Sequence, residues 1–270
     1  MDYTPMLDTA RRAAREAGAL MRASSGKPVY QQWKNAHEIV VGSVFPIQEK
    51  IIEIIRADFP NDAILAEERE TQPALESDPL WIVDPVDGSL NFHQGIPHAA
   101  ISIAYRAGGI DQVGVVYDPF RDEMFDAMRG RSARLNDQPI VVQQVSEGED
   151  AYAQAIVGAD LPGELATRLQ TLNIATLMAS QCTGLTIMGS PALGLCYVAA
   201  GRLHAYFALG LELWDVAAAS VILVESGGIL TDIRGGSWLH TTGGYIASNG
   251  VIHGWMMRNA QTVFWKDRQE

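Results

Sequence analysis

Apolar residues recur three or four positions apart in two stretches near the start of the chain, the spacing of a helix with one buried face. The first predicted helix begins at Thr4-Pro5, with proline at the first helical position, and ends at Gly26. Its apolar face consists of Leu7, Ala10, Ala14, Ala17 and Met21. The second begins near Ser43 and ends at Phe59-Pro60, and its buried face consists of Ile47, Ile51, Ile54 and Ile55.

Short apolar runs between turn residues predict the strands. We expect strands at 64–66, 80–83, 99–105, 113–117, 124–128, 132–135, 155–159, 174–178, 203–207, 229–232 and 245–247, and further helices at 162–172, 191–201, 216–225 and 251–265. Consecutive strands followed by mixed strands and helices predict an α/β fold of the layered α+β type. The polar stretch 143–150 predicts a boundary between an N-terminal α+β subdomain, 1–145, and a C-terminal α/β subdomain, 146–270.

The stretch 80–92 carries the strongest chemical signal. Its strand is predicted to end at Asp84-Pro85, because proline fixes φ and lacks an N–H. Asp87-Gly88 then predicts a tight turn, and Ser89 is predicted as the N-cap of a helical turn. The two carboxylates repel each other, so a divalent cation such as Mg²⁺ or Mn²⁺ would stabilise them together. The N–H groups of the helix start suit a phosphate.

Taken alone, these residues also fit an ordinary surface turn, because Asp-Pro and Asp-Gly are common turn dipeptides. Two other acidic positions favour a metal site. Glu67-Glu68 follows a predicted strand, and Asp215 opens a predicted helix. An isolated solvated charge is not expected at the end of an apolar element. The three stretches together supply the several carboxylates that a two-metal phosphatase needs.

Composition narrows the functional classes. The chain has 270 residues, 47% of them hydrophobic, which suffices for one large core or two small ones. The net charge of −12 argues against a broad nucleic-acid surface, so no direct nucleic-acid partner is expected. No run reaches a membrane span of roughly 20 apolar residues, so no membrane partner is expected. Cys182 and Cys196 lack metal-site spacing and predict free thiols in a reducing cytoplasm.

Five motifs occur in order along nearly the whole chain. They are Ala66-Glu67-Glu68, the run Trp-Ile-Val-Asp-Pro-Val-Asp-Gly-Ser-Leu-Asn-Phe at 81–92, Gly-Ser-Pro-Ala at 189–192, Trp-Asp-Val-Ala-Ala at 214–218 and Glu-Ser-Gly-Gly-Ile at 225–229. The sequence thereby closely resembles the inositol monophosphatase superfamily of Mg²⁺-dependent, lithium-sensitive phosphatases, which includes the extragenic suppressor type. The resemblance implies an αβαβα sandwich of the sugar-phosphatase type, with the active site between two subdomains.

The resemblance also implies a role for each matching residue. The implied ligands of a first Mg²⁺ are Glu67, Asp84 and the Val86 carbonyl, and those of a second are Asp84, Asp87 and Asp215. A weak third ion is implied as an addition, and Mn²⁺ as a substitute. The implied catalytic residues, which act with a metal-activated water, are Glu67, Asp87 and Ser89. The implied substrate- and phosphate-binding residues are Gly88, Ser89, Ser190, Ala192 and Glu212. A homodimer is implied as well.

Three positions depart from the family pattern. Val44 stands where the family has an aspartate that supports a third metal and the attacking water, and an apolar side chain does neither. Ala208 stands where inositol-hydrolysing relatives carry an acidic sugar-binding residue, and Leu90 replaces a small hydroxyl residue. The first departure predicts that catalysis is slow, is restricted to two metals, or is lost. The other two point away from inositol as the substrate.

The primary hypothesis is a Mg²⁺-dependent phosphatase that hydrolyses a small phosphate monoester: an inositol phosphate, a sugar phosphate or a nucleotide 3′-phosphate. The alternative, motivated by Val44, is a catalytically weakened family member that acts as a binding or regulatory protein. Because the suppressor type contacts the transcription machinery, this alternative implies a protein partner. A third hypothesis is a phosphatase for bisphosphorylated nucleotides or sugars.

Overall fold

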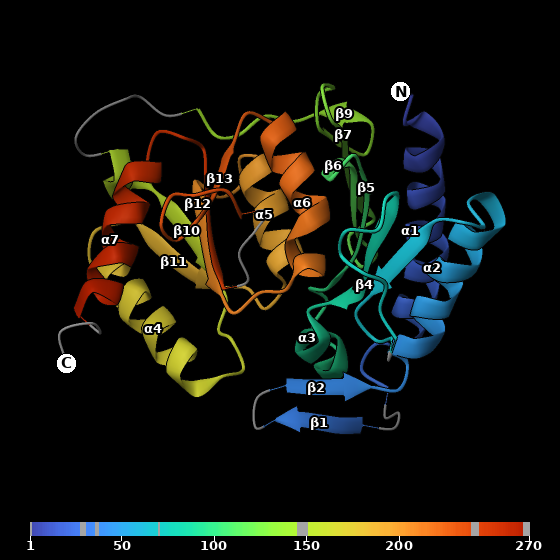
Figure 1. Ribbon diagram of the computed structural model, residues 1–270. Coiled ribbons are helices and arrows are strands. Elements are labelled where there is room, and N and C mark those ends of the chain that lie inside the picture. The colour runs from blue at the N-terminus through green and yellow to red at the C-terminus, as the bar shows by residue number, and fades with distance from the viewer. Residues whose placement is uncertain are drawn as a thin grey trace.

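A five-layer sandwich of helices and sheets organises the chain, as the family resemblance implies (Figure 1). The structure, a computed structural model, describes residues 2–27, 31–35, 38–69, 71–144, 151–238 and 243–266. The subdomain boundary predicted between residues 145 and 146 lies outside the described residues and stays a prediction. Within the described ranges, no helix is both long enough and apolar enough to cross a membrane.

A seven-stranded sheet forms one of the two β layers. Its strands, in spatial order, are β3 (Ala63–Ala66), β4 (Leu80–Asp87), β5 (Ala100–Ala107), β6 (Ile110–Asp118), β7 (Glu123–Met128), β8 (Arg134–Leu135) and β9 (Gln138–Pro139). β3 and β4 are parallel, whereas each later neighbour is antiparallel. All eight residues of β4 are buried, which explains its nearly unbroken apolar sequence.

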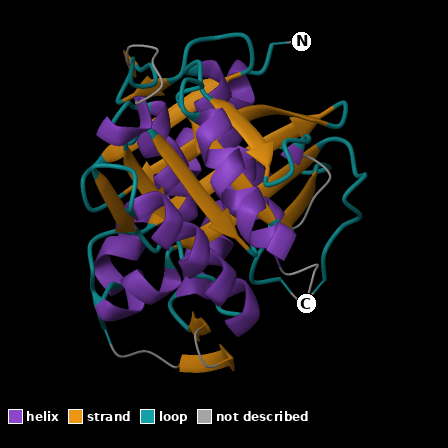
Figure 2. Cartoon of the chain, turned by 90° about the vertical axis from the view of Figure 1, so that its left-hand side faces the viewer, coloured by secondary structure: helices purple, strands orange, loops and turns teal. Residues whose placement is uncertain are grey.

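Two helices cover the outer face of this sheet, α1 (Thr4–Ser24) and α2 (Val44–Asp58), and confirm the two helices predicted first (Figure 1). Buried alanines on α1 provide a flat face against α2 and the sheet: Ala10, Ala13, Ala14 and Ala17. The antiparallel pair β1 (Gln31–Asn35) and β2 (Glu38–Val41) projects from one end, beside the short helix α3 (Ser89–Gln94) (Figures 1 and 2).

A five-stranded sheet forms the other β layer. Its spatial order is β11 (Gly184–Ile187), β10 (Ile156–Ala159), β12 (Ala205–Leu209), β14 (Gly244–Ser248) and β13 (Ile229–Asp232). β10 runs parallel to both of its neighbours, whereas β14 runs antiparallel to both of its own. The 3₁₀ turn η1 (Ala151–Gln154) precedes β10. The helices α4 (Leu165–Ala179) and α7 (His253–Lys266) cover the outer face (Figure 1).

The strand predicted at 174–178 is wrong, because these residues continue α4. The β-branched and apolar side chains there favoured a strand, but burial follows helical spacing at Thr171, Ile174, Ala175 and Met178. α4 also begins later than predicted. The Glu164 carboxylate accepts hydrogen bonds from the N–H groups of Ala166 and Thr167, which fixes the start of the helix at Leu165.

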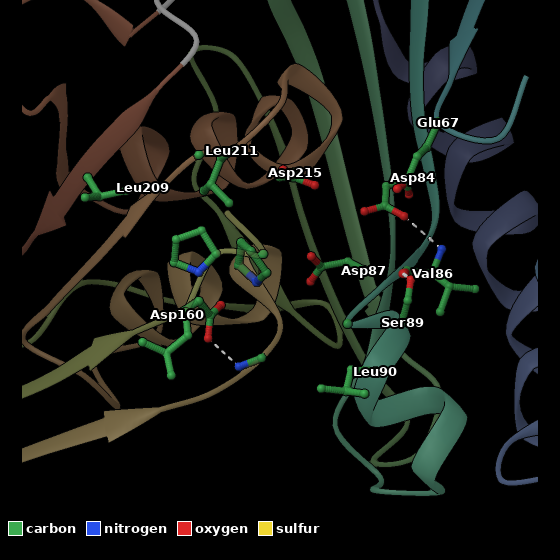
Figure 3. A pocket seen from close by; sticks show the side chains of 17 residues that line it. Glu67, Asp84, Val86, Asp87, Ser89, Leu90, Asp160, Leu209, Leu211 and Asp215 are labelled. Carbon is green, nitrogen blue, oxygen red and sulfur yellow. Dashed lines mark hydrogen bonds between the residues drawn. The ribbon is translucent and has the colours of Figure 1, made fainter. Parts of the chain in front are cut away.

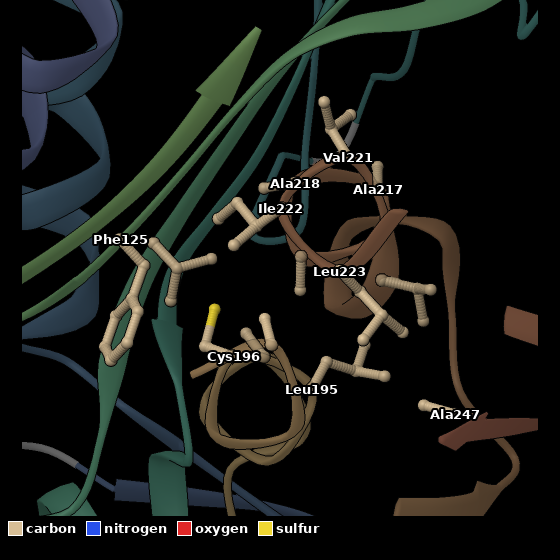
Figure 4. Packing of buried hydrophobic residues seen from close by; sticks show 14 of the residues in the cluster. Phe125, Leu195, Cys196, Ala217, Ala218, Val221, Ile222, Leu223 and Ala247 are labelled. Carbon is tan, nitrogen blue, oxygen red and sulfur yellow. The ribbon is translucent and has the colours of Figure 1, made fainter. Parts of the chain in front are cut away.

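The middle layer consists of α5 (Pro191–Ala199) and α6 (Leu213–Glu225), packed between the two sheets (Figures 1 and 4). Figure 4 shows Cys196 of α5 and Ile222 of α6 in the same apolar cluster as Phe125 of β7. A side chain at Gly114 of β6 would place its Cβ 2.1 Å from the Ala218 carbonyl oxygen. Glycine therefore allows α6 to lie directly on the seven-stranded sheet, and this packing fixes the start of α6 relative to β4.

Candidate active site

A pocket of about 240 Å³ opens where β3, β4, β10 and β12 end and where α3, α5 and α6 begin (Figure 3). The acidic residues that line it are Glu67, Asp84, Asp87, Asp160 and Asp215. Apart from Ser89, the rest of the described lining is glycine, proline, valine or leucine. The pocket therefore combines a concentrated negative charge with apolar walls, and none of its described lining residues is basic.

β4 brings Asp84 and Asp87 to the pocket through a bulge. The expectation that this strand ends at Asp84-Pro85 is wrong, because the register with β5 shifts between the two aspartates and the strand then continues. Pro85 and Val86 together oppose a single residue of β5. The proline, which has no N–H to donate, therefore lies at a position where no backbone hydrogen bond to β5 is required. One Asp84 oxygen accepts from the Val86 N–H at 2.9 Å, which fixes the carboxylate.

α6 places Asp215 beside these two carboxylates. Asp215 accepts from the Glu212 N–H at 2.7 Å, while the Glu212 side chain accepts from the Asp215 N–H. Ligand atoms of Asp84, Asp87 and Asp215 lie within 4.8 Å of one another. Glu67 lines the same pocket at the end of β3, where its N–H donates to the Val83 carbonyl at 3.2 Å. The three aspartates thus meet at one point, and Glu67, from another segment, lines the same pocket.

Burial and mutual repulsion raise the pKa values of the three aspartates. For Asp84, burial is the largest cause, followed by the charge of Glu67, and the pKa lies well above its usual range. For Asp87, burial is followed by the charge of Asp215, with the same result. The pKa of Asp215 is raised to about 8 by burial and then by Glu67. At neutral pH, the folded chain without a cation therefore holds protons here that the unfolded chain releases.

The residues of this cluster fit a divalent cation. Carboxylate and carbonyl oxygens are the hard ligands that Mg²⁺ and Mn²⁺ prefer. The Val86 carbonyl accepts from the Ser89 hydroxyl at 3.0 Å, and its second lone pair can serve a cation. Among the described lining residues no cationic side chain is present to neutralise the carboxylates, so a metal ion is the matching partner.

Gly88 is the N-cap of α3, and the expectation that Ser89 would cap it is wrong. Gly88 has φ 92°, a conformation that glycine adopts without strain, as the turn prediction required. A Cβ at this position would lie 2.8 Å from the Gly189 carbonyl oxygen. The close approach between the turn at Gly88 and the chain at Gly189 therefore also requires glycine at position 88. Ser89 is the first helical residue, and it lines the pocket beside the carboxylates.

Ser190 and Ala192 lie behind the pocket and do not line it. Ser190 is the N-cap of α5, as predicted, but its hydroxyl donates to the Asp87 carboxylate instead of capping the helix. The Ala192 N–H donates to the same Asp87 oxygen at 3.1 Å. Both residues therefore hold Asp87 in place. Glu212, the N-cap of α6, is also outside the pocket lining, and the binding roles of all three stay predictions.

Asp160 lines the pocket, although no motif pointed to it. It directly follows β10 and is 7% exposed. Its Oδ1 accepts from the N–H groups of Met188, at 3.1 Å, and Gly189, while its Oδ2 accepts from the Tyr206 hydroxyl at 2.6 Å. Burial raises the pKa of Asp160 to about 6. The signal that located Asp84, a carboxylate at the end of a predicted strand, applies equally to Asp160.

Val44 packs into the core and does not line the pocket. It is the first residue of α2, is 1% exposed, and belongs to the same apolar cluster as Ile47 and Ile51. Position 44 therefore supplies no ligand and no proton acceptor to the site, in agreement with the departure found in the sequence.

Comparisons with known proteins show the family of the chain and agree with its fold. The model of the inositol monophosphatase family matches residues 2–264. The Nus factor SuhB of Pasteurella multocida (strain Pm70) is 38% identical over 248 residues, which cover 90% of this chain and 91% of that protein. The Nus factor SuhB of Escherichia coli (strain K12) is 36% identical over 258 residues, covering 94% and 95%.

Two solved structures share the whole fold. The extragenic suppressor protein suhB of Bartonella henselae has a TM-score of 0.89 at 29% identity, covering 95% of this chain and 98% of that one. The IMPase of Thermotoga maritima has a TM-score of 0.87 at 29% identity, covering 97% and 99%. The architecture described above is therefore that of these proteins.

Proposed function

Because the chain belongs to the inositol monophosphatase family, we propose that it is a Mg²⁺-dependent phosphatase that hydrolyses a small phosphate monoester. The observation that carries the proposal is the cluster of Asp84, Asp87 and Asp215, whose ligand atoms lie within 4.8 Å of one another beside the Gly88-Ser89 turn. Buried carboxylates at this spacing oppose folding unless a cation compensates them. The cluster therefore supports a metal-dependent reaction.

The residues proposed to hold two cations are Glu67, Asp84, the Val86 carbonyl, Asp87 and Asp215. Bound Mg²⁺ or Mn²⁺ would supply Lewis-acid activation of water and would neutralise the phosphate charge. The Glu67 carboxylate would accept a proton from the attacking water. The Ser89 hydroxyl donates to the Val86 carbonyl, so its lone pairs point elsewhere and can accept a hydrogen bond that orients this water.

The start of α3 is proposed as the phosphate site. The N–H groups of Gly88 and Ser89 lie at the helix start and beside the cluster, where they would donate to phosphate oxygens. Ser190 and Ala192 would contribute through Asp87, because both donate to its carboxylate. A weak third ion would find no ligand at Val44.

We propose that the substrate carries one phosphate. A second phosphate would meet acidic or apolar side chains, because no described lining residue is basic. This charge pattern favours an inositol phosphate, a sugar phosphate or a nucleotide 3′-phosphate over a bisphosphorylated substrate. Ala208 is buried in β12 and Leu90 is apolar, so neither offers a polar group to inositol.

The proposed activity is tested by phosphate release from purified protein in millimolar Mg²⁺. The panel contains inositol phosphates, sugar phosphates and 3′-phosphoadenosine 5′-phosphate. We expect release from a monophosphate, little from the bisphosphate, and loss of release when a chelator removes the metal. Mn²⁺ should restore part of the rate. Folded protein that releases no phosphate from any member of the panel would refute the proposal.

A second candidate function is a binding or regulatory role. Two observations favour it: Val44 replaces a site aspartate, and relatives named Nus factor SuhB share more than a third of their residues with this chain. Under this function the fold and the carboxylate cluster would remain, while turnover would be slow and a protein would be the partner.

Replacing Val44 with aspartate separates the two functions. Because Val44 is buried in an apolar cluster, we expect Val44→Asp to lower the free energy of unfolding by about 1–3 kcal/mol and to change turnover less than about tenfold. Urea denaturation and phosphate release measure the two effects, with Val44→Thr as the control of similar size. A much larger rise in turnover would instead identify the wild type as a catalytically weakened member.

We also propose a homodimer located in the cytoplasm. The homodimer is implied by the family resemblance, and exposed leucines at helical spacing on α4 offer an apolar face: Leu165, Leu169 and Leu172. Free Cys182 and Cys196 are consistent with a reducing compartment. The acidic chain is proposed to bind neither nucleic acid nor membranes. A monomer in sedimentation experiments would contradict the dimer.

A further inference from the structure

Asp160 ties a turn beside the pocket to the five-stranded sheet. It directly follows β10, and its carboxylate accepts from three successive backbone N–H groups, those of Met188, Gly189 and Ser190. Its Oδ2 also accepts from the Tyr206 hydroxyl at 2.6 Å. Successive N–H groups that converge on one carboxylate form an anion-binding nest. The charge of Asp160 is therefore compensated by donors of its own chain, and the turn at 188–190 is held where it is.

Tyr206 fixes the same carboxylate from the side of the sheet. It belongs to β12 and is 1% exposed. Its ring lies against two glycines: a Cβ at Gly158 of β10 would lie 2.9 Å from the ring, and a Cβ at Gly194 of α5 would lie closer still. A buried tyrosine hydroxyl needs a hydrogen-bond partner, and Asp160 supplies it. Tyr206 and Asp160 therefore hold each other in one position.

The strand that leads into this turn does not position it firmly. β11 lies at the edge of the five-stranded sheet, and its last two residues are exposed. The Met188 N–H is shared between the Ala159 carbonyl, at 3.0 Å, and Asp160, at 3.1 Å. The N–H groups of Gly189 and Ser190 are bonded to Asp160 as well. The position of the turn therefore depends on the Asp160 carboxylate.

The turn contacts the carboxylate cluster through Ser190. The Ser190 hydroxyl and the Ala192 N–H both donate to Oδ2 of Asp87. Ser190 is the N-cap of α5 and is fully buried, so a displaced turn would move both donors away from Asp87. Figure 3 shows Asp87 and Asp160 reaching the pocket from different elements. A chain of hydrogen bonds thus connects the end of β10 with a predicted cation ligand on β4.

We infer that Asp160 is a positioning residue for the cation site: it holds the turn at 188–190 and, through the Ser190 hydroxyl, sets the orientation of the Asp87 carboxylate. The inference rests on the proposed phosphatase function and adds a residue that acts without binding the cation or the phosphate. Side chains that hold a metal ligand in place typically change metal affinity or activity by about 10- to 100-fold. Because Asp160 acts through one further residue, we expect its effect at the lower end of this range.

The affinity for Mn²⁺, measured by titration calorimetry without substrate, tests the inference separately from catalysis. We expect Ser190→Ala to weaken Mn²⁺ binding by about 10- to 100-fold and Asp160→Ala to weaken it by about 10-fold. In protein that already carries Ser190→Ala, adding Asp160→Ala should weaken binding by less than about threefold, because the connecting hydroxyl is gone. Unchanged Mn²⁺ affinity in Asp160→Ala, or losses that simply multiply in the double variant, would overturn the inference.

Asp232→Ala is the matched control. Asp232 ends β13 of the same sheet, is 8% exposed, and lies outside the pocket lining. Its Oδ1 accepts from the N–H groups of Arg234 at 2.8 Å and Gly236 at 2.7 Å, so it also anchors a turn. We expect Asp232→Ala to lower the unfolding temperature about as much as Asp160→Ala does, while the Mn²⁺ affinity stays within about twofold of the wild type. Equal losses of Mn²⁺ affinity in the two variants would overturn the inference.

Two milder variants carry the test if Asp160→Ala does not fold. Asp160→Asn keeps one oxygen for the turn, and Tyr206→Phe removes a single donor. Each should weaken Mn²⁺ binding by about 2- to 10-fold, the effect of one hydrogen bond, and wild-type affinity in both would overturn the inference. Wild-type protein that binds Mn²⁺ but releases no phosphate would refute the phosphatase function, while the Mn²⁺ affinities of the variants would still confirm or overturn the positioning role of Asp160.

Discussion

Replacing Asp87 with asparagine is expected to reduce phosphate release by about 100- to 10,000-fold, because it removes one carboxylate from the cation cluster. The substitution should not disturb the fold. Ser190 and Ala192 both donate to one oxygen of Asp87, and the asparagine carbonyl oxygen can accept both bonds. Measurement of kcat with saturating Mg²⁺ tests the prediction, and a variant that keeps its rate would contradict it.

The same variant should stabilise the metal-free protein. Burial and the charge of Asp215 raise the pKa of Asp87 in the folded state. The contribution of Asp87 to the free energy of unfolding is therefore complete below its unfolded pKa near 4, and it is lost as the pH rises through the folded pKa. At pH 8 without metal, we expect the free energy of unfolding of Asp87→Asn to exceed that of the wild type by about 1–3 kcal/mol. The variant should therefore also unfold at a higher temperature. The difference should shrink toward pH 4.

The control for both measurements is Asp8→Asn, which neutralises an exposed carboxylate on α1. It should leave phosphate release and the pH dependence of stability close to those of the wild type. If Asp87→Asn were less stable than the wild type at every pH, the carboxylates would not oppose folding, and the argument for a cation would lose its electrostatic basis.

Replacing Gly88 with alanine is expected to destabilise the protein by about 2–4 kcal/mol and to impair the phosphate site. The residue has φ 92°, which costs alanine about 1 kcal/mol. Its Cβ would also lie 2.8 Å from the Gly189 carbonyl oxygen and 3.2 Å from that of His98. Both contacts are backbone atoms, so the two segments must separate, and the start of α3 must shift. Urea denaturation and kcat/KM record the two effects.

Gly108→Ala is the matched control for this prediction. Gly108 has φ 63° in the turn between β5 and β6, and its Cβ would meet nothing within 4 Å. Its loss of stability, about 1 kcal/mol, measures the backbone strain alone. The additional loss of stability in Gly88→Ala measures the cost of bringing a Cβ close to the Gly189 carbonyl oxygen. Equal losses in the two variants would show that the crossing at Gly189 tolerates a methyl group.

The sequence predicted the elements whose burial pattern is periodic, and it failed where a local pattern has two interpretations. α1 and α2 have one apolar face each, and the spacing of their alanines and isoleucines is unambiguous. The stretch 174–178 is equally apolar as a strand or as a helix, and only the continuation of the stripe from Thr171 decides for α4. Pro85 predicts a strand end, because a sequence does not reveal that β4 forms a bulge at this proline and then continues its pairing with β5.

The site was predicted as far as the motifs reach. They located the carboxylates at the ends of β3 and β4 and near the start of α6, and the structure brings these together. They did not locate Asp160, which is brought to the pocket by the pairing of β10 with β12. They also could not show that the Ser190 hydroxyl points at Asp87, because that contact depends on how α5 packs against β4.

The order in which the cluster is assembled has a consequence for biosynthesis. The ribosome completes Asp84 and Asp87 well before Asp215, and at roughly 5–20 residues per second the interval is on the order of ten seconds. During that time the inner face of the seven-stranded sheet also lacks α5 and α6. A nascent chain that ends before Asp215 therefore lacks one carboxylate of the proposed cation site. The proposed cation site is complete only once α6 has been synthesised and has packed onto the seven-stranded sheet.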